Sequence, residues 1–120
     1  MIPLTGATDL SAKRGYLVTI SGETATLSAS ATTPARGVVL EGADTDGVSS
    51  VGILGTLEGS VMLKLSGTVT KGDRLQQHTD GSVVTDAGTG ARTLVGVALE
   101  DGKSGDLIEC ATHVPIYYAA

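Results

Sequence analysis

Seventeen glycines divide this chain of 120 residues into short apolar runs, and their spacing restricts the fold more than any other feature. In the runs at 16–20 and 60–65, apolar side chains recur at every second position, which is typical of half-buried β-strands. Turn-forming residues follow roughly every ten positions, as in small barrels and sandwiches. No window sustains apolar residues at helical spacing. The sequence therefore predicts an all-β fold, a small compact β-barrel or β-sandwich.

Individual strands can be predicted from these runs. The run 94–99 is the most apolar in the chain and predicts a buried strand. The runs 51–57 and 60–65 are expected to be a pair of strands joined by a turn. The runs 107–112 and 114–118 are expected to be two strands that close the domain.

Two stretches of the chain resemble each other. Residues 14–17 resemble 71–75 with one inserted residue, at an offset of 57 positions between their glycines, Gly15 and Gly72. Residues 37–42 resemble 96–101 at an offset of 59 positions. The matches are short and rich in Val and Gly, so chance similarity is the alternative to an internal repeat. We expect a single β domain over 14–120, with 14–57 and 71–112 as the two units if the repeat holds.

The two ends of the chain supply the candidate contact residues. Residues 1–13 are small and polar and predict an N-terminal arm, extended to add a strand to a partner or else disordered. In that arm Ile2, Pro3 and Leu4 are the candidate partner contacts. At the other end Tyr117 and Tyr118 are the candidate subunit interface, because Tyr is enriched at interfaces, although packing on their own domain is the alternative.

Composition points to a thin core and excludes several partners. The chain has no Trp, no Phe and three Tyr, so aliphatic side chains must fill the core, and we expect oligomerisation or docking to add stability. The net charge of −5 and the absence of a basic cluster argue against nucleic-acid binding. No apolar stretch approaches the roughly 20 residues of a membrane span, and no signal peptide is recognisable, so we expect synthesis in the cytoplasm.

No constellation of residues predicts catalysis, a metal or a cofactor. His78 and His113 lie outside any nucleophile motif, and Cys110 is expected to be a small buried apolar side chain. The segment 44–47 is expected to be a solvated acidic turn, with weak cation binding as the alternative. The segment 88–90 lacks the third glycine and the following helix of a phosphate loop, and predicts a hairpin loop. The chain is therefore not expected to be an enzyme.

Four motifs in the second half occur in a characteristic order. They are Lys71-Gly72-Asp73-Arg74-Leu75, Asp80-Gly81-Ser82-Val83-Val84, Val95-Gly96-Val97-Ala98-Leu99-Glu100-Asp101 and Gly105-Asp106-Leu107-Ile108-Glu109. This order and spacing resemble the small capsid cement, or head decoration, proteins of tailed bacteriophages. The resemblance covers 70–112 well and, through the repeat, 14–57 loosely. The first half differs from the shorter family members in longer loops at 30–36 and 42–50.

The resemblance implies a β-barrel-like subunit, usually a homotrimer, on the outside of the capsid where copies of the major capsid protein meet. It implies that the chain is a structural virion protein that binds the outer surface of the capsid and stabilises the shell. Two alternatives stay open at this point. One is another phage structural β domain, associated with a tail or fibre; the other is a β-clip-like ligand-binding or accessory domain.

Overall fold

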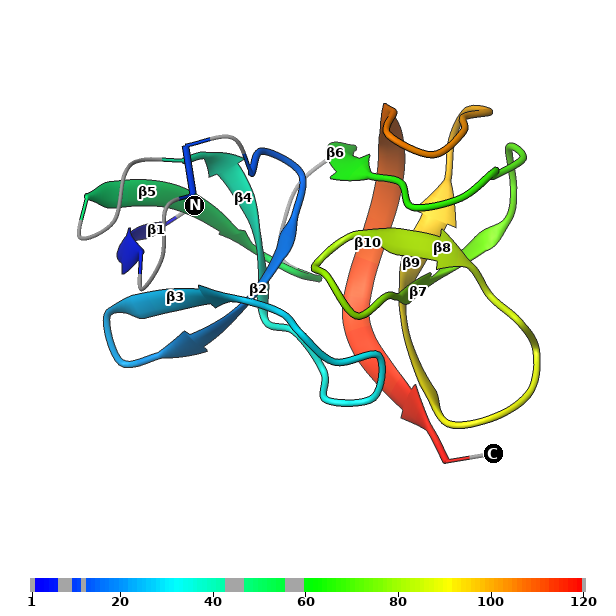
Figure 1. Ribbon diagram of the computed structural model, residues 1–120, viewed down its shortest axis with the longest axis horizontal. Helices are drawn as coiled ribbons and strands as arrows, with labels where there is room; N and C mark the ends of the chain where they lie inside the picture. Colours follow the sequence, from blue (N-terminus) through cyan, green and yellow to red (C-terminus); the bar gives the residue numbers. More distant parts are fainter. Residues whose placement is uncertain (1, 7–9, 12, 43–46, 56–59, 120) are drawn as a thin grey trace.

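The computed structural model describes residues 2–6, 10–11, 13–42, 47–55 and 60–119. Strands make up the regular structure of these residues, and together they form two sheets (Figure 1). The strands are β1 (Ile2–Gly6), β2 (Leu17–Ser21), β3 (Thr24–Leu27), β4 (Gly37–Glu41), β5 (Val48–Ile53), β6 (Val61–Lys64), β7 (Arg74–Gln77), β8 (Val83–Thr85), β9 (Arg92–Ala98) and β10 (Leu107–Tyr118). The described residues hold no helix that is long and apolar enough to cross a membrane. The predicted all-β fold is confirmed.

The two sheets lie side by side and have the same topology (Figure 1). The first is a closed barrel in the order β1-β3-β2-β4-β5, with β5 paired back to β1. The second is a five-stranded sheet in the order β6-β10-β9-β7-β8. A single parallel bridge from Leu65, just after β6, to Val83 of β8 joins its two edges, and we call this curled sheet the second barrel. Adding five to each strand number of the first barrel gives the second barrel: β1 corresponds to β6, β2 to β7, and so on. Corresponding strands have corresponding neighbours, and each pair keeps its parallel or antiparallel direction.

Backbone hydrogen bonds repeat at the offsets found in the sequence. In the first barrel the Gly15 amide donates to the Val39 carbonyl, and the Val39 amide donates to the Tyr16 carbonyl. The second barrel has the same two bonds: the amide of residue 72 donates to the carbonyl of residue 98, and the amide of residue 98 donates to the carbonyl of residue 73. Residues 15 and 72 are 57 positions apart, and 39 and 98 are 59 apart. One structural unit therefore occurs twice in the chain.

The N-terminal segment belongs to the first barrel. The sequence suggested an arm over 1–13, but the structure places Ile2–Gly6 between β5 and β3 of the same chain, paired with both. Leu4 is 5% exposed and packs in the core. The physical reason is closure, because the barrel needs β1 to satisfy the edges of β3 and β5. The parallel pairing with β3 is long-range, and local periodicity cannot show it.

The core is aliphatic, as the composition requires, and it falls into two clusters. One fills the first barrel, with Leu10 and Val18 among its fully buried members. The other extends across both barrels. Its members are Leu17, Ala35, Val38 and Leu54 from the first barrel and Val61, Leu63, Leu65, Val69, Leu75, Val83, Val95, Ala98, Ile108 and Cys110 from the second. Because the larger cluster crosses the junction, the two barrels form one packed body.

A buried amide also joins the barrels. Gln77 at the end of β7 is fully buried and faces the loop between β3 and β4. Its Oε1 accepts a hydrogen bond from the Ala35 amide at 2.7 Å. Its Nε2 donates to the carbonyls of Ser30 and Thr33 at 3.1 and 2.9 Å, and lies 3.4 Å from the Ser28 hydroxyl. One side chain of the second barrel therefore lies within hydrogen-bond distance of four polar atoms of the first.

Candidate partner-binding surface

The second barrel carries a two-stranded extension that the first barrel lacks. At the offset of 59, the first residue of β4 matches Gly96 and the last residue of β5 matches Thr112. Strand β9 nevertheless begins earlier, at Arg92, and β10 continues to Tyr118. The two added pieces, 92–95 and 113–118, pair with each other in antiparallel register, and we call them the ribbon.

The inner side of the ribbon packs on the first barrel. The Thr93 amide donates to the Ala31 carbonyl at 3.0 Å, and the Thr93 hydroxyl donates to the Thr32 carbonyl at 2.9 Å. Gly55 lies against the backbone of Val114, so closely that a Cβ on Gly55 would be 2.7 Å from the Val114 nitrogen. The ribbon therefore packs against the loop 30–36 and the end of β5, and we call these contacts the clasp.

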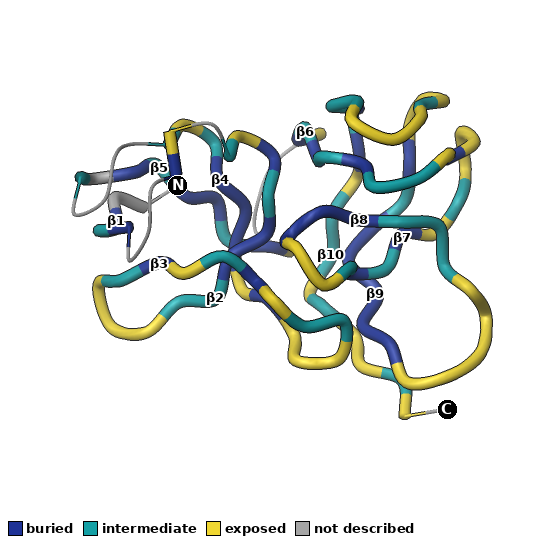
Figure 2. The backbone as a smooth tube through the Cα atoms, viewed as in Figure 1, coloured by how far each residue is buried: buried dark blue, intermediate teal, exposed yellow. Residues whose placement is uncertain are grey.

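The end of the ribbon exposes apolar side chains on both of its faces, because Ile116 and Tyr117 are neighbours in the strand and point to opposite sides. Val114, Ile116 and Tyr117 are 65%, 46% and 48% exposed. Strand β6 pairs with β10 only from Leu107 to Cys110, so beyond that point the outer edge of β10 has no partner strand among the residues that the structure describes. Figure 2 shows the change along β10, from buried residues near its start to exposed ones at its end. We call Val114, Ile116 and Tyr117 the ribbon patch.

A hollow of about 290 Å³ lies beside the ribbon patch, at the junction of the two barrels. It is lined mainly by apolar side chains: Pro34, Ala35, Arg36, Ile53 and Leu54 from the first barrel and Val114 and Pro115 from β10. The register of β10 against β9 shifts between Thr112 and Ile116, and this irregularity places Val114 and Pro115 at the rim of the hollow. Irregular pairing of this kind often redirects side chains at functional edges.

The two tyrosines proposed as a subunit interface have different surroundings. The Tyr118 ring lies under the Arg92 guanidinium, with 4.9 Å between the guanidinium carbon and the ring centroid. Such a cation–π contact holds Tyr118 on its own domain. Tyr117 points the other way along the strand alternation and is half exposed. Of the pair, Tyr117 is the residue available to a partner.

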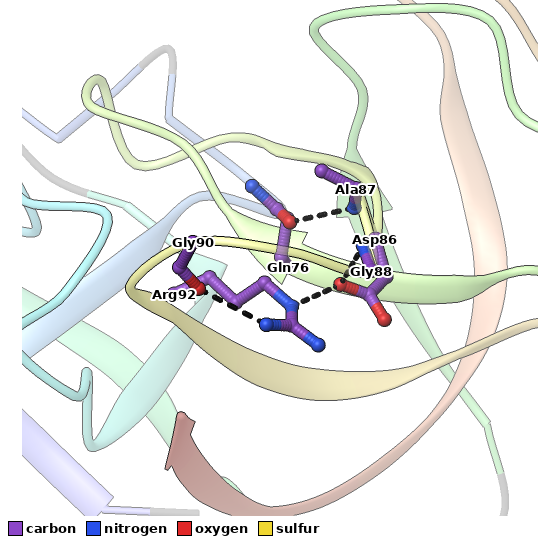
Figure 3. A network of polar contacts seen from close by, with 6 residues as sticks. All are labelled: Gln76, Asp86, Ala87, Gly88, Gly90 and Arg92. Atoms are coloured by element: carbon purple, nitrogen blue, oxygen red, sulfur yellow. Dashed lines mark hydrogen bonds and ion pairs between the residues drawn. The ribbon is translucent and has the colours of Figure 1, made fainter. Parts of the chain in front are cut away.

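Arg92 also fixes the loop between β8 and β9 (Figure 3). Its Nε donates to Asp86 Oδ1 at 2.5 Å and its Nη1 donates to the Gly90 carbonyl at 3.0 Å. The Gly88 amide donates to the same Asp86 oxygen at 3.0 Å. Partial burial alone would raise the pKa of Asp86, but the Gly88 amide and the Arg92 guanidinium outweigh it and lower that pKa. The loop joins two strands that flank β7, so the hairpin predicted at 88–90 is wrong.

The residues considered for chemistry do not come together. Cys110 is buried, and burial, followed by the nearby Glu100 carboxylate, raises the pKa of its thiol to about 12. The His113 Nδ1 lies 2.8 Å from the Val114 carbonyl, on the strand rather than in a cleft. No group of three His, Cys, Asp or Glu side chains suited to a metal occurs among the described residues. Asp44, Asp46 and Glu58 lie outside those residues, so the acidic turn at 44–47 stays a prediction.

Comparisons with known proteins match the chain by its fold. No protein-family model matches it, and no curated protein is similar to it in sequence. Among solved structures it is similar to the N base of the head fiber protein gp8.5 of bacteriophage phi29, with a TM-score of 0.69. The similarity covers 92% of this chain and 91% of that chain, at 15% sequence identity. The two proteins therefore share a fold, including both barrels.

Proposed function

We propose that the chain is a structural protein of a tailed-phage virion, a cement or decoration protein that binds the outer surface of the capsid and stabilises the shell. Its proposed partner is the major capsid protein, and its proposed assembly is a homotrimer. The observation that carries the proposal is the fold shared along 92% of the chain with a protein described as the base of a phage head fiber. The ordered motifs of the second half, which resemble the capsid cement family, support the same setting.

The structure explains what those motifs do within the chain. Asp73 Oδ2 accepts a hydrogen bond from the Thr70 amide, and Asp106 Oδ2 accepts one from the Lys103 amide. Gly72 and Gly105 provide the positive φ that the same two turns require, at 94° and 93°. The motifs therefore shape the turns that precede β7 and β10. Because these residues have a role in folding, we propose that the contacts with a capsid come from other residues.

The structure describes the three N-terminal candidates for a partner contact to different extents. Leu4 points into the core of the first barrel, so in this structure its side chain does not reach a partner. The backbones of Ile2 and Pro3 pair with Val51 and Ser50 of β5. A capsid contact through Ile2, Pro3 or Leu4 stays a prediction, and for Leu4 it would require β1 to leave the barrel.

A second candidate function is favoured by the same comparison. The similar protein is the N base of a head fiber, so this chain could equally support a fiber on the capsid surface. Both functions place the chain on the phage head, but a fiber base would occupy selected positions and a cement protein would occupy every equivalent position of the lattice.

Copy number in purified virions tests both functions. We expect quantitative mass spectrometry to find the chain at a fixed ratio to the major capsid protein, and particle images to show it on the outside of the head. A ratio that matches all equivalent lattice positions selects the cement function, and a smaller fixed number selects the fiber base. Absence of the chain from virions, or its location along the tail, would overturn the proposal of a capsid-bound protein.

A further inference from the structure

We infer that the ribbon patch and the neighbouring hollow form the contact between copies of this chain, with Tyr117 or Ile116 of one copy seated in the hollow of the next. The inference rests on the proposed homotrimer and names the surface that would build it. Neither the shared turns nor the resemblance to cement proteins indicates this surface. It follows from the ribbon that the first barrel lacks and from the hollow beside it.

Charge selects a second copy as the occupant. The chain carries a net charge of −5, so copies repel each other unless they meet at a neutral surface. From Cys110 to Ala119 β10 and its continuation hold no Asp, Glu, Lys or Arg. At the far end of the ribbon, opposite Tyr118, the Arg92 charge is already paired with Asp86. The one charged side chain that lines the hollow, Arg36, is exposed and positive, so it does not repel an acidic copy. Two acidic molecules can therefore approach each other at the ribbon patch and the hollow without repulsion between like charges.

A strongly charged partner would fit a different part of the second barrel. The turn before β10 exposes Glu100 and Asp101, at the opposite end of that strand from Tyr117. The strand between them is 12 residues long. The acidic turn and the neutral ribbon patch are thus separated, and a basic surface would be drawn to the turn rather than to the ribbon.

The shapes of the two features fit each other. The hollow of about 290 Å³ exceeds the roughly 150 Å³ that is enough to hold a benzene ring. An aromatic or branched side chain that is half exposed on one copy can therefore be buried in the hollow of another. Pro115 supplies no amide hydrogen, which limits strand-to-strand pairing along this edge. We therefore expect side-chain packing to dominate the contact.

The arrangement is head-to-tail, since a protruding side chain of one copy enters the hollow of its neighbour. A contact of this kind generates a ring when the rotation between copies closes. The protruding residues follow the hollow's own Val114 and Pro115 in the chain, so each copy carries both halves of the contact close together. A closed trimer would bury the ribbon patch of all three copies.

A matched pair of lysine substitutions tests the surface. Ile116→Lys places a charge in the contact, and Leu99→Lys places the same charge on an apolar residue that is 43% exposed just beyond β9, away from the ribbon. We expect the wild type and Leu99→Lys to sediment as the same oligomer. We expect Ile116→Lys to sediment as a monomer, with a dissociation constant raised at least about 100-fold, because a buried unpaired charge is costly.

Hydrogen exchange of the wild type gives a readout that does not depend on a variant folding. We expect the amides of residues 112–118 to exchange more slowly at protein concentrations where the oligomer forms, and the amides of 99–106 to be unchanged. The inference fails if Ile116→Lys and Tyr117→Lys both remain oligomeric, or if oligomerisation protects the acidic turn and leaves the ribbon unaffected.

Capsid binding separates this inference from the proposed function. An oligomer held by another surface that still binds capsids would overturn the ribbon contact and leave the virion role standing. A wild type that stays monomeric at all concentrations, yet pellets with capsids, would also overturn the ribbon contact and leave the virion role standing. An oligomer that dissociates with Ile116→Lys but never binds capsids would support the ribbon contact and remove the virion role.

Discussion

Replacing Gln77 by Leu should remove the polar connection between the barrels. The Ala35 amide is buried, and leaving it without an acceptor costs about 1–3 kcal/mol. The carbonyls of Ser30 and Thr33 are partly accessible to water, so the loss of their hydrogen bonds costs about 0.5 kcal/mol each. The sum is about 3 kcal/mol. For a chain of this size, that lowers the melting temperature by about 12 °C.

The neighbouring residue supplies the control. Gln76→Leu makes the same chemical change one position earlier on β7, where the side chain is half-buried and accepts one bond from the exposed Ala87 amide. Its expected cost is at most about 1 kcal/mol. Urea unfolding followed by circular dichroism measures both variants. The reasoning is refuted if Gln77→Leu loses no more free energy of unfolding than Gln76→Leu.

The Gln77→Glu variant adds a pH test with a definite sign. A carboxylate at this site would be buried and would face the Ser30 and Thr33 carbonyls, so the pKa of the Glu side chain should be higher in the folded than in the unfolded state. The folded state then binds more protons than the unfolded state. The stability that comes from this protonated side chain is fully present below the unfolded pKa of about 4.3, and it is lost as the pH rises through the folded pKa. We expect this variant to be closest to wild type near pH 4 and weakest at neutral pH. A flat difference across that range would contradict the assignment.

Three other measurements follow from the repeat and from the buried groups. Gly15 and Gly72 occupy equivalent turns with positive φ, but a Cβ at Gly15 would lie 2.4 Å from a Leu107 methyl, while a Cβ at Gly72 would meet open space. Gly72→Ala should therefore lower the free energy of unfolding in urea by about 1 kcal/mol, and Gly15→Ala should lower it by about 1–3 kcal/mol more. The Asp86 pKa is lower in the folded state than its unfolded value near 3.8, so the ionised carboxylate stabilises the fold above pH 3.8, and this stabilisation is lost as the pH falls through the folded-state pKa. Asp86→Asn should therefore reduce stability at pH 6 and make stability less dependent on pH in the acid range. The Cys110 thiol should not react with a maleimide in the native protein at pH 7 and should react fully in urea, counted by intact mass.

The sequence predicted well what depends on neighbouring residues. The alternation of apolar side chains and the glycine-containing turns gave the all-β fold, and the apolar run at 94–99 lies largely in β9. The predicted pairing of 51–57 with 60–65 is wrong, because β5 and β6 belong to different barrels. Alternation identifies a strand but not its partner, and here the boundary between the two repeated units falls between two adjacent strands. A tandem repeat with Gly-rich turns can therefore mimic a hairpin.

The candidate surface was harder to predict for related reasons. The sequence predicts two strands at 107–112 and 114–118, whereas the structure has one strand, β10, whose register against β9 shifts between Thr112 and Ile116, around Pro115. The two tyrosines were identified, but alternation alone did not tell which of them faces outward. Gln77 gave no signal at all, because a polar residue in a strand ordinarily faces solvent and its buried partners lie in a loop more than forty positions away.

The repeat itself separates residues that fold the chain from residues that are free to bind. Features common to both barrels, such as the turns at Gly15 and Gly72, close the same hydrogen bonds in each unit and are explained by the fold. The ribbon occurs in one unit only, and its inner side is explained by the clasp on the first barrel through Thr93. The exposed side chains of Ile116 and Tyr117 are needed neither by the repeated unit nor by the contacts of Thr93 with the first barrel. Apolar side chains exposed without a role in folding are the ones for which a partner must be sought. Of the four large exposed ones among the described residues, three lie together at the end of β10, and the fourth, Leu99, stands apart from them.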